Sequence, residues 1–200
     1  MYKLIIKLLT PIIKFFLRVK VEGKVSVPEG EKFIVCANHL SNWDPILVVV
    51  CTGIPINFLA KESLFKVPIL KNIIKAFGTI PINRNGSDIA SIRKSIEVIQ
   101  SGGTFSIFPQ GKRLHVPPHP DQTKNGVGLI TGKAQAGVLP VGIYTKNYKI
   151  MPFRKIFVKI GEFIPYSELQ FGEDGRDYAL VSKQIFTRIC SLAIPEGEIK

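Results

Sequence analysis

One short segment of the sequence combines residue types that could move a proton. It reads NHLSNWDP over residues 38–45 and follows an apolar run. His39 and Asp44 are five residues apart, and on a continuous helix this spacing would point their side chains in different directions. They can meet if His39 lies in a turn and Asp44 in the first helical turn after it, with Ser41 as the N-cap. A carboxylate on one imidazole nitrogen fixes the tautomer and leaves the other nitrogen free as a base.

The same spacing has a purely structural interpretation. Ser41 and Asp44 are three residues apart, as in a variant of the capping box, and His39 would then be a polar loop residue. The pattern alone therefore leaves a general base and a helix cap both open.

Two further segments end in cations after an expected strand. Residues 78–84 end in Arg84, and residues 108–113, FPQGKR, end in Arg113. Open α/β sheets place their sites at the carboxyl ends of strands, so both arginines could lie beside His39. Two guanidinium groups would hold a phosphate well. Alternatively, each arginine is a solvated loop cation.

The hydrophobic pattern predicts the sheet that such a site needs. Short apolar runs alternate with segments of helical periodicity, and the stretch 114–125 is rich in proline and polar residues, which predicts a surface loop. The alternation predicts a single α/β domain with a largely parallel mixed sheet flanked by helices. We expect strands over residues 32–37, 56–60, 79–82, 104–108, 138–143 and 156–160, and helices over 44–52, 67–77, 87–101, 126–136 and 178–192.

The first twenty residues differ from the rest because they are apolar and carry five basic groups but no acidic one. On a helix, Lys3, Lys7, Lys14 and Arg18 would share one narrow face, and Pro11 would kink or split the helix. This pattern is typical of a helix in the membrane interface. We therefore expect residues 1–20 to form an amphipathic membrane-associating segment and residues 21–200 the main domain. The alternative is a helix packed on the domain with a solvated basic stripe.

Composition narrows the class of partner. The formal charge is +12, yet 46% of the residues are hydrophobic and the mean hydropathy is +0.20. A basic chain implies an anionic partner, and the apolar excess disfavours a nucleic-acid-binding module. No transmembrane span is expected, because the longest uncharged run, residues 45–60, contains prolines and a glycine. We see no signal peptide pattern either.

The metal-binding residue types do not form a recognisable site. Cys36, Cys51 and Cys190 are widely spaced in apolar runs, which argues against disulfides and zinc and favours a reducing compartment. His115 and His119 are separated by two prolines, which exclude a helical chelate. We therefore expect no metal.

Together the motifs resemble the 1-acylglycerol-3-phosphate acyltransferase family of the glycerolipid acyltransferases. The family's Asn-His-x-x-x-x-Asp pattern is matched at Asn38, His39 and Asp44, and its second block by residues 78–84. The third block, usually FPEGTR, is matched by FPQGKR at residues 108–113, which includes Gly111, and the fourth by Leu139-Pro140-Val141.

The resemblance implies an acyl transfer. His39, oriented by Asp44, would be the general base for the free hydroxyl of a lysophospholipid, most simply 1-acylglycerol-3-phosphate, which gives phosphatidic acid. The donor would be an acyl thioester of coenzyme A or acyl carrier protein, and no cofactor or metal is implied. Arg84 and Arg113 would hold the phosphate, and Lys61 resembles a family lysine near the site, although a surface lysine is as good an interpretation. The enzyme would be a peripheral or monotopic protein on the cytoplasmic face of the cell membrane.

Two departures from the family pattern affect the acceptor. Gln110 replaces a glutamate, and Lys112 replaces a threonine and adds charge beside the expected phosphate site. A different lysolipid head group is therefore an alternative. A non-catalytic protein that binds anionic lipid through a degenerate site is another.

Overall fold

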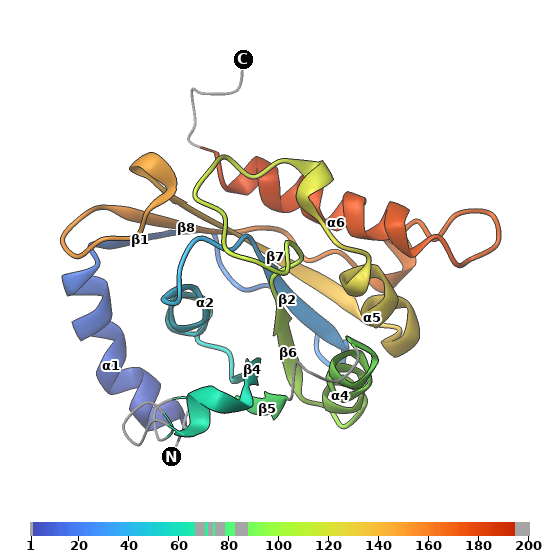
Figure 1. The fold of residues 1–200 in the computed structure, drawn as a ribbon, viewed down its shortest axis with the longest axis horizontal. Helices are drawn as coiled ribbons and strands as arrows, with labels where there is room; N and C mark the ends of the chain where they lie inside the picture. Colours follow the sequence, from blue (N-terminus) through green and yellow to red (C-terminus); the bar gives the residue numbers. More distant parts are fainter. Residues whose placement is uncertain (1, 67–70, 72–73, 75–78, 83–87, 195–200) are drawn as a thin grey trace.

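The helices and strands of the computed structural model follow the expected alternation (Figure 1). The structure describes residues 2–66, 71, 74, 79–82 and 88–194. The strands are β1 (Val19–Glu22), β2 (Phe33–Ala37), β3 (Ile56–Asn57), β4 (Leu59–Lys61), β5 (Ile80–Ile82), β6 (Thr104–Ile107), β7 (Gly137–Thr145) and β8 (Ile156–Ile160). The helices are α1 (Tyr2–Phe16), α2 (Asp44–Thr52), α4 (Asp88–Gln100), α5 (Gly126–Ala134) and α6 (Tyr178–Leu192). Single helical turns are η1 (Glu62–Lys66), η2 (Pro120–Gln122), η3 (Lys146–Tyr148) and η4 (Tyr166–Glu168).

A mixed sheet brings several strand ends to one edge. Among the described residues it has six strands in the order β1-β8-β7-β2-β6-β3, all paired in parallel except β7 with β8. The strands β2, β6 and β7 therefore end at the same edge. Because β8 runs antiparallel to β7, it begins at this edge, and so does β1, whose Val19 pairs with Ile156. We call this the carboxyl edge of β2.

Helices cover both faces of the sheet, and each face has its own hydrophobic core. The side chains of β2 alternate between the two cores: Val35 and Ala37 pack with α1 and α2, and Ile34 and Cys36 pack with α4, α5 and α6. Figure 1 shows the same division, with α1 and α2 on one side of the sheet. Strict alternation along a buried strand is what fixes its register between two helical layers.

The fold class predicted from the sequence is confirmed. The predicted bounds of α2 and α6 are those observed, and the stripe Val181, Ile185 and Ile189 of α6 is fully buried. The helix predicted over residues 67–77 falls almost entirely outside the described residues.

The single strand predicted over residues 56–60 is wrong. Ile56–Asn57 pair with β6 in the main sheet, whereas Leu59–Lys61 pair with β5 in a separate two-stranded sheet. Phe58, between them, is buried, and its carbonyl oxygen accepts the N–H of Ile80 at 2.7 Å. The segment looks like one strand in the sequence because Ile56 and Phe58 pack in one core and Leu59 packs against the other.

The N-terminal helix is shorter than expected and packs on the domain. It runs through Pro11 and ends at Phe16, so Arg18 lies outside it and the expected boundary at residue 20 falls inside β1. Ile6 and Leu17 are buried in the core with α2, but Ile12, Phe15 and Phe16 are exposed. Within the described residues, no helix has the length and apolar character that crossing a bilayer would take.

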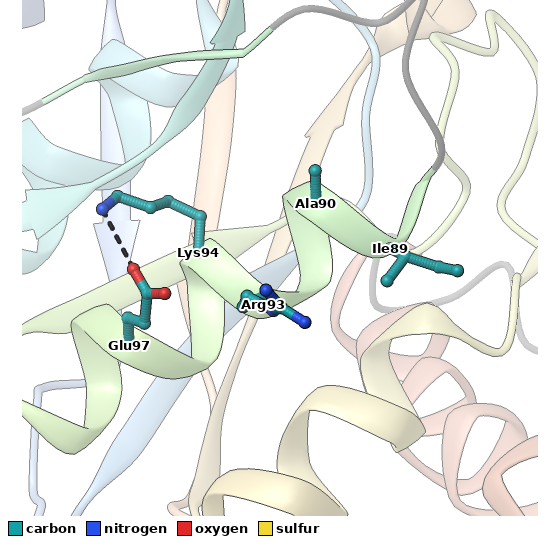
Figure 2. A pocket seen from close by; sticks show the side chains of 5 residues that line it. All are labelled: Ile89, Ala90, Arg93, Lys94 and Glu97. Carbon is teal, nitrogen blue, oxygen red and sulfur yellow. Dashed lines mark hydrogen bonds and ion pairs between the residues drawn. The ribbon is translucent and has the colours of Figure 1, made fainter.

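Helix α4 packs on the other face of the sheet from α2, and its outer surface carries a hollow (Figure 2). It is lined by Ile89, Ala90, Arg93, Lys94 and Glu97, with an ion pair of 3.0 Å between Lys94 and Glu97. None of these residues belongs to the motifs singled out above.

Helix α5 has a glycine at residue 128 where α6 packs directly on it. A Cβ on Gly128 would lie 2.2 Å from the carbonyl oxygen of Tyr178, whereas a Cβ on Gly126 would meet nothing within 4 Å. We expect Gly128→Ala to lower the free energy of unfolding by about 1–3 kcal/mol through overpacking. Gly126→Ala, on the same helix, should be neutral or stabilising by up to about 1 kcal/mol. Denaturant unfolding of both variants measures this, and equal effects would contradict the packing.

Candidate active site

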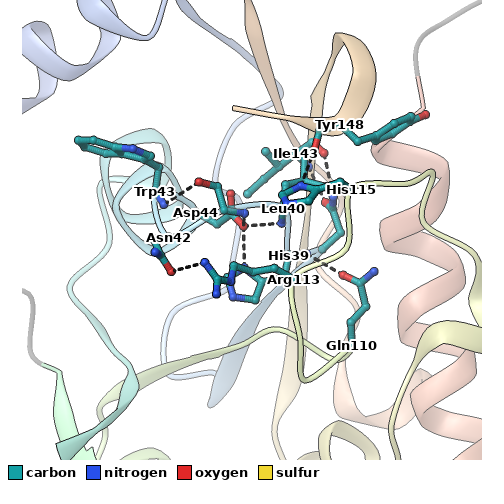
Figure 3. Close-up of polar contacts among 12 residues, drawn as sticks. His39, Leu40, Asn42, Trp43, Asp44, Gln110, Arg113, His115, Ile143 and Tyr148 are labelled. Carbon is teal, nitrogen blue, oxygen red and sulfur yellow. Dashed lines mark hydrogen bonds and ion pairs between the residues drawn. The ribbon is translucent and has the colours of Figure 1, made fainter. Parts of the chain in front are cut away.

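One carboxylate oxygen organises the turn between β2 and α2 (Figure 3). Asp44 is the first residue of α2, and its carboxylate is fully buried. Its Oδ2 accepts hydrogen bonds from the backbone N–H groups of Leu40 at 2.6 Å and Ser41 at 2.7 Å, and contacts His39 Nδ1 at 2.6 Å. Oxygen Oδ1 has no hydrogen-bond partner among the described residues. Two backbone N–H groups thus donate to the oxygen that contacts His39, and these hydrogen bonds favour the charged form of the carboxyl.

The protonation of His39 follows from this arrangement. In its ionised form Asp44 has no proton to donate, so in that form of the site Nδ1 carries the hydrogen and donates it to Asp44. Nitrogen Nε2 has no partner within the described part of the chain, and the side chain is 19% exposed. The imidazole also stacks on Phe108, with ring centroids 4.2 Å apart and planes 17° apart. Its free nitrogen is thus available as a base at the sheet edge.

Burial and hydrogen bonding act on Asp44 in opposite directions. Burial raises the pKa of the Asp44 carboxyl above its ordinary value, and the hydrogen bonds from His39, Ser41 and Leu40 counteract part of that rise. The N–H donors on Oδ2 hold the charged form in place. A carboxylate kept out of water in this way is a strong partner for an imidazolium.

Asn38 closes the end of β2 onto β7. Its fully buried amide donates from Nδ2 to the carbonyl oxygen of Ile143 at 2.8 Å and accepts the Ile143 N–H at 2.7 Å. The side chain therefore continues the pairing of β2 with β7 beyond Ala37, the last paired residue. These two hydrogen bonds fix the point at which the chain leaves β2 and turns toward His39.

Gln110 supports the backbone of His39. It is 2% exposed, and its Oε1 accepts the His39 N–H at 2.7 Å. Its Nε2 donates to Gln122 Oε1 at 3.0 Å, and Gln122 is itself fixed by backbone groups, since it accepts from His119 N–H and donates to the carbonyl oxygen of Pro117. Both ends of the Gln110 amide are thus used inside the protein.

The remaining residues of the third block lie on the surface beside this pair. Gly111 has φ +66°, a conformation that favours glycine, and the side chain of Lys124 crosses it. Lys112 and Arg113 are exposed, and Arg113 donates to Asn42 Oδ1 at 3.0 Å, which holds it over the turn of His39 and Asp44. Figure 3 shows Arg113 on this turn.

Two expected phosphate ligands are not placed by the structure. Arg84 lies outside the described residues. Lys61 ends β4 in the small sheet, and only its backbone is described. Of the two arginines expected to hold the phosphate, Arg113 is therefore the one that the structure describes.

Ser41 does not cap the helix as expected. The N-cap of α2 is Trp43, without a side-chain hydrogen bond, and Ser41 Oγ accepts the N–H of Trp43 at 3.3 Å. The capping-box interpretation is half right, because Asp44 does accept the Ser41 N–H. The carboxylate serves both the turn and the histidine, so the two interpretations of the motif are not exclusive.

Phe108 and Gln122 contribute to the site but were not predicted from the sequence. Phe108 opens the third block, and its stacking on His39 depends on the distance between β2 and β6. Gln122 follows His119 at the three-residue spacing of a capping box, which the structure contains. This spacing could have predicted the helical turn that contains Gln122, but it does not indicate the contact between Gln122 and Gln110.

The two other histidines point to separate partners. His115 Nδ1 lies 3.2 Å from the carbonyl oxygen of Tyr148, and His119 Nδ1 accepts the N–H of Asp121 at 3.3 Å. Across the described residues, no group of three or more His, Cys, Asp or Glu side chains could hold a metal ion.

Comparison with known proteins identifies relatives of this arrangement. The Acyltransferase family model matches residues 18–144, which include the His39 turn and the third and fourth blocks. A 1-acyl-sn-glycerol-3-phosphate acyltransferase of Borreliella burgdorferi is 28% identical over 133 residues, 66% of this chain and 53% of that protein. One of Neisseria gonorrhoeae is 27% identical over 192 residues, 80% of this chain and 69% of that protein. The chain thus spans roughly half to two thirds of these relatives' length.

A solved structure shares the fold. The crystal structure of the 1-acyl-sn-glycerophosphate acyltransferase PlsC from Thermotoga maritima is similar with a TM-score of 0.68 and 28% identity. The similarity covers 94% of this chain and 77% of that one.

The contact between Gln110 and Gln122 predicts a cost for restoring the family's usual residue. In Gln110→Glu, an oxygen would replace Nε2 and face Gln122 Oε1, and Gln122 cannot flip without losing both backbone partners. We expect the free energy of unfolding at neutral pH to fall by about 2–3 kcal/mol. The introduced carboxyl would have a raised pKa in the folded state. The loss should therefore be absent in acid, where the protonated group can donate, and should grow as the pH rises through that pKa.

A double-mutant cycle with Gln122→Ala separates this contact from general disruption. The opposing oxygen is absent in the Gln122→Ala background, so Gln110→Glu should cost less there than in the wild-type background. Denaturant unfolding across the pH range measures both. Equal costs in the two backgrounds, or a loss that does not depend on pH, would contradict the proposed contact.

Proposed function

The chain belongs to the Acyltransferase family, and on this basis we propose that it transfers a fatty acyl group from an acyl thioester to the free hydroxyl of a lysophospholipid. The acceptor is 1-acylglycerol-3-phosphate and the product is phosphatidic acid. The observation that carries the proposal is the imidazole of His39, whose Nδ1 is held by Asp44 while Nε2 is unpaired among the described residues. The names of the relatives and of the solved PlsC structure support the choice of acceptor.

In the proposed reaction, His39 Nε2 removes the proton from the acceptor hydroxyl. The hydroxyl oxygen forms a bond to the thioester carbonyl carbon, the carbon–sulfur bond breaks, and the imidazolium returns its proton to the leaving thiolate. Asp44 stabilises the imidazolium without taking the proton. A positioned base typically contributes about 10²–10⁴-fold, so orientation of the two substrates must supply much of the remaining acceleration. The stacked ring of Phe108 restricts the imidazole to one plane.

The phosphate of the acceptor is bound by cations of the third block and its neighbours. Arg113 is held beside the turn by Asn42, and a guanidinium presents paired donors that match phosphate oxygens. Lys112 adds a second exposed charge. Arg84 and Lys61 complete the set in this proposal, on the strength of their positions in the family pattern.

The co-substrate supplies the activated acyl group. A thioester already has a good leaving group, so the proposed step uses base catalysis and needs no metal or cofactor. Acyl-CoA and acyl carrier protein both present such a thioester, and both are donors in the proposal.

Residues 1–20 attach the enzyme to the lipid that it modifies. Ile12, Phe15 and Phe16 of α1 are exposed although the helix packs on the domain, and exposed apolar side chains among cations favour a membrane surface. The wide spacing of the three cysteines in apolar runs favours a reducing compartment. We place the enzyme as a peripheral or monotopic protein on the cytoplasmic face of the cell membrane.

An acyl-transfer assay with purified full chain tests the proposed function. We expect turnover of an acyl thioester with 1-acylglycerol-3-phosphate, tested with both coenzyme A and acyl carrier protein donors. His39→Ala should lower kcat by at least about 10²-fold. Lys94→Ala, which removes an exposed side chain of α4 that pairs with Glu97, should keep most of the activity.

Three results would count against the proposal. Unchanged turnover in His39→Ala would exclude the base. Binding of anionic lipid without any turnover would favour a non-catalytic lipid-binding protein. Activity with a neutral lysolipid but none with a phosphate monoester would contradict the role of Arg113.

A further inference from the structure

A cluster of exposed aromatic rings joins two segments that are far apart in the sequence. Phe15 and Phe16 end α1 and are 73% and 50% exposed, and Phe153, in the connection between β7 and β8, is 59% exposed. The rings of Phe16 and Phe153 lie 5.9 Å apart, and Phe16 packs edge-on against Phe15 at 5.7 Å. Ile12 and Met151 add exposed apolar surface on the same two segments. We call these five side chains the aromatic edge patch.

The backbone holds Phe153 in an unfavourable conformation that presents its ring. Its φ is +61°, which bulky residues rarely adopt. The Phe153 N–H donates to the carbonyl oxygen of Phe16 at 2.9 Å, so this conformation ties the connection to the end of α1. Glycine or asparagine would adopt this backbone conformation with less strain than phenylalanine. The presence of phenylalanine here therefore suggests that its exposed ring has a role.

The charge around the patch has one sign. Residues 11–18 and 146–155 contain no acidic residue. The exposed cations of these two segments are Arg18, Lys146, Lys149, Arg154 and Lys155. Apolar rings on segments whose charged residues are all cations match the interface of an anionic bilayer, where rings enter the acyl boundary and cations meet phosphates.

The patch lies at the same edge of the sheet as the candidate active site. The connection that carries Phe153 follows the end of β7, and Phe16 precedes β1, which begins at the carboxyl edge of β2. Tyr148 in this connection contacts His115, two residues after Arg113. Trp43, 46% exposed, precedes Asp44 at this edge.

We propose that the β7–β8 connection, through Phe153, forms one bilayer-binding surface with the end of α1, and that this surface places the carboxyl edge of β2 against an anionic phospholipid membrane. The inference rests on the proposed membrane association and extends it from the N-terminal segment to residues 146–155. A lysophospholipid could then reach His39 from the bilayer without first dissolving in water.

Vesicle binding of the full chain tests the surface. We expect Phe153→Asn to weaken binding to vesicles that contain an anionic phospholipid by about tenfold, because the variant lacks the ring that would enter the bilayer. Its melting temperature should not fall, since asparagine tolerates positive φ. Ile89→Asn is the matched control, because Ile89 is 67% exposed on α4, across the sheet from α2. It should bind vesicles within about twofold of the wild-type protein.

The single tryptophan reports which edge faces the bilayer. Fluorescence of Trp43 in vesicle-bound wild-type protein should be quenched by brominated acyl chains if the carboxyl edge of β2 meets the membrane. Turnover of a monomeric short-chain acceptor should be the same in Phe153→Asn and wild type, which separates membrane binding from acyl transfer.

Distinct outcomes would overturn the inference. Wild-type binding that Phe153→Asn leaves unchanged would assign membrane association to another surface, with the proposed acyl transfer unaffected. A change in oligomeric state without a change in vesicle binding would make the patch an interface between copies of the chain. An absence of vesicle binding by the wild-type protein would remove both this surface and the proposed membrane association, and an unquenched Trp43 would exclude the orientation.

Discussion

Three N–H groups converge on a single buried oxygen, Asp44 Oδ2, and the geometry of the site depends on that contact. Two of the donors belong to the backbone of the turn and one to the imidazole of His39. The same atom therefore shapes the loop after β2, begins α2 and sets the tautomer of the histidine. Burial raises the pKa of the Asp44 carboxyl and the hydrogen bonds to it counteract part of that rise, so the turn and the proposed base depend on the same contacts.

The surrounding residues hold this turn from both sides. Asn38 continues β2 onto β7 through Ile143, and Gln110, in the turn after β6 on the other side of β2, accepts the backbone N–H of His39. Phe108 stacks on the imidazole, and Phe58 stacks in turn on Phe108 with ring planes 16° apart. The edge of a parallel sheet is suited to such a site, because neighbouring strands end together and their loops can share contacts.

Much of this arrangement could be predicted from the sequence because it is local or periodic. The bounds of α2 and α6 follow from apolar spacing, and the meeting of His39 with Asp44 follows from a turn that leads into a helix. The strand Val19–Glu22 was missed because two of its four residues are charged and it directly follows the basic helix. The role of Gln110 could not be predicted either. This role depends on the hydrogen bond from Gln110 to Gln122, and the loop that holds Gln122 has no periodic pattern from which its path could be predicted.

The central claim is that Asp44 holds His39 with Nδ1 protonated and Nε2 free, and NMR of the imidazole nitrogens measures this directly. In ¹⁵N-labelled protein near neutral pH, with the His39 signals assigned by comparison with His39→Ala, we expect Nδ1 to carry the proton and Nε2 to be unprotonated. In Asp44→Asn the preference should weaken, because the neutral amide binds the imidazole less strongly. A neutral His39 protonated on Nε2, or a tautomer unchanged in Asp44→Asn, would contradict the account.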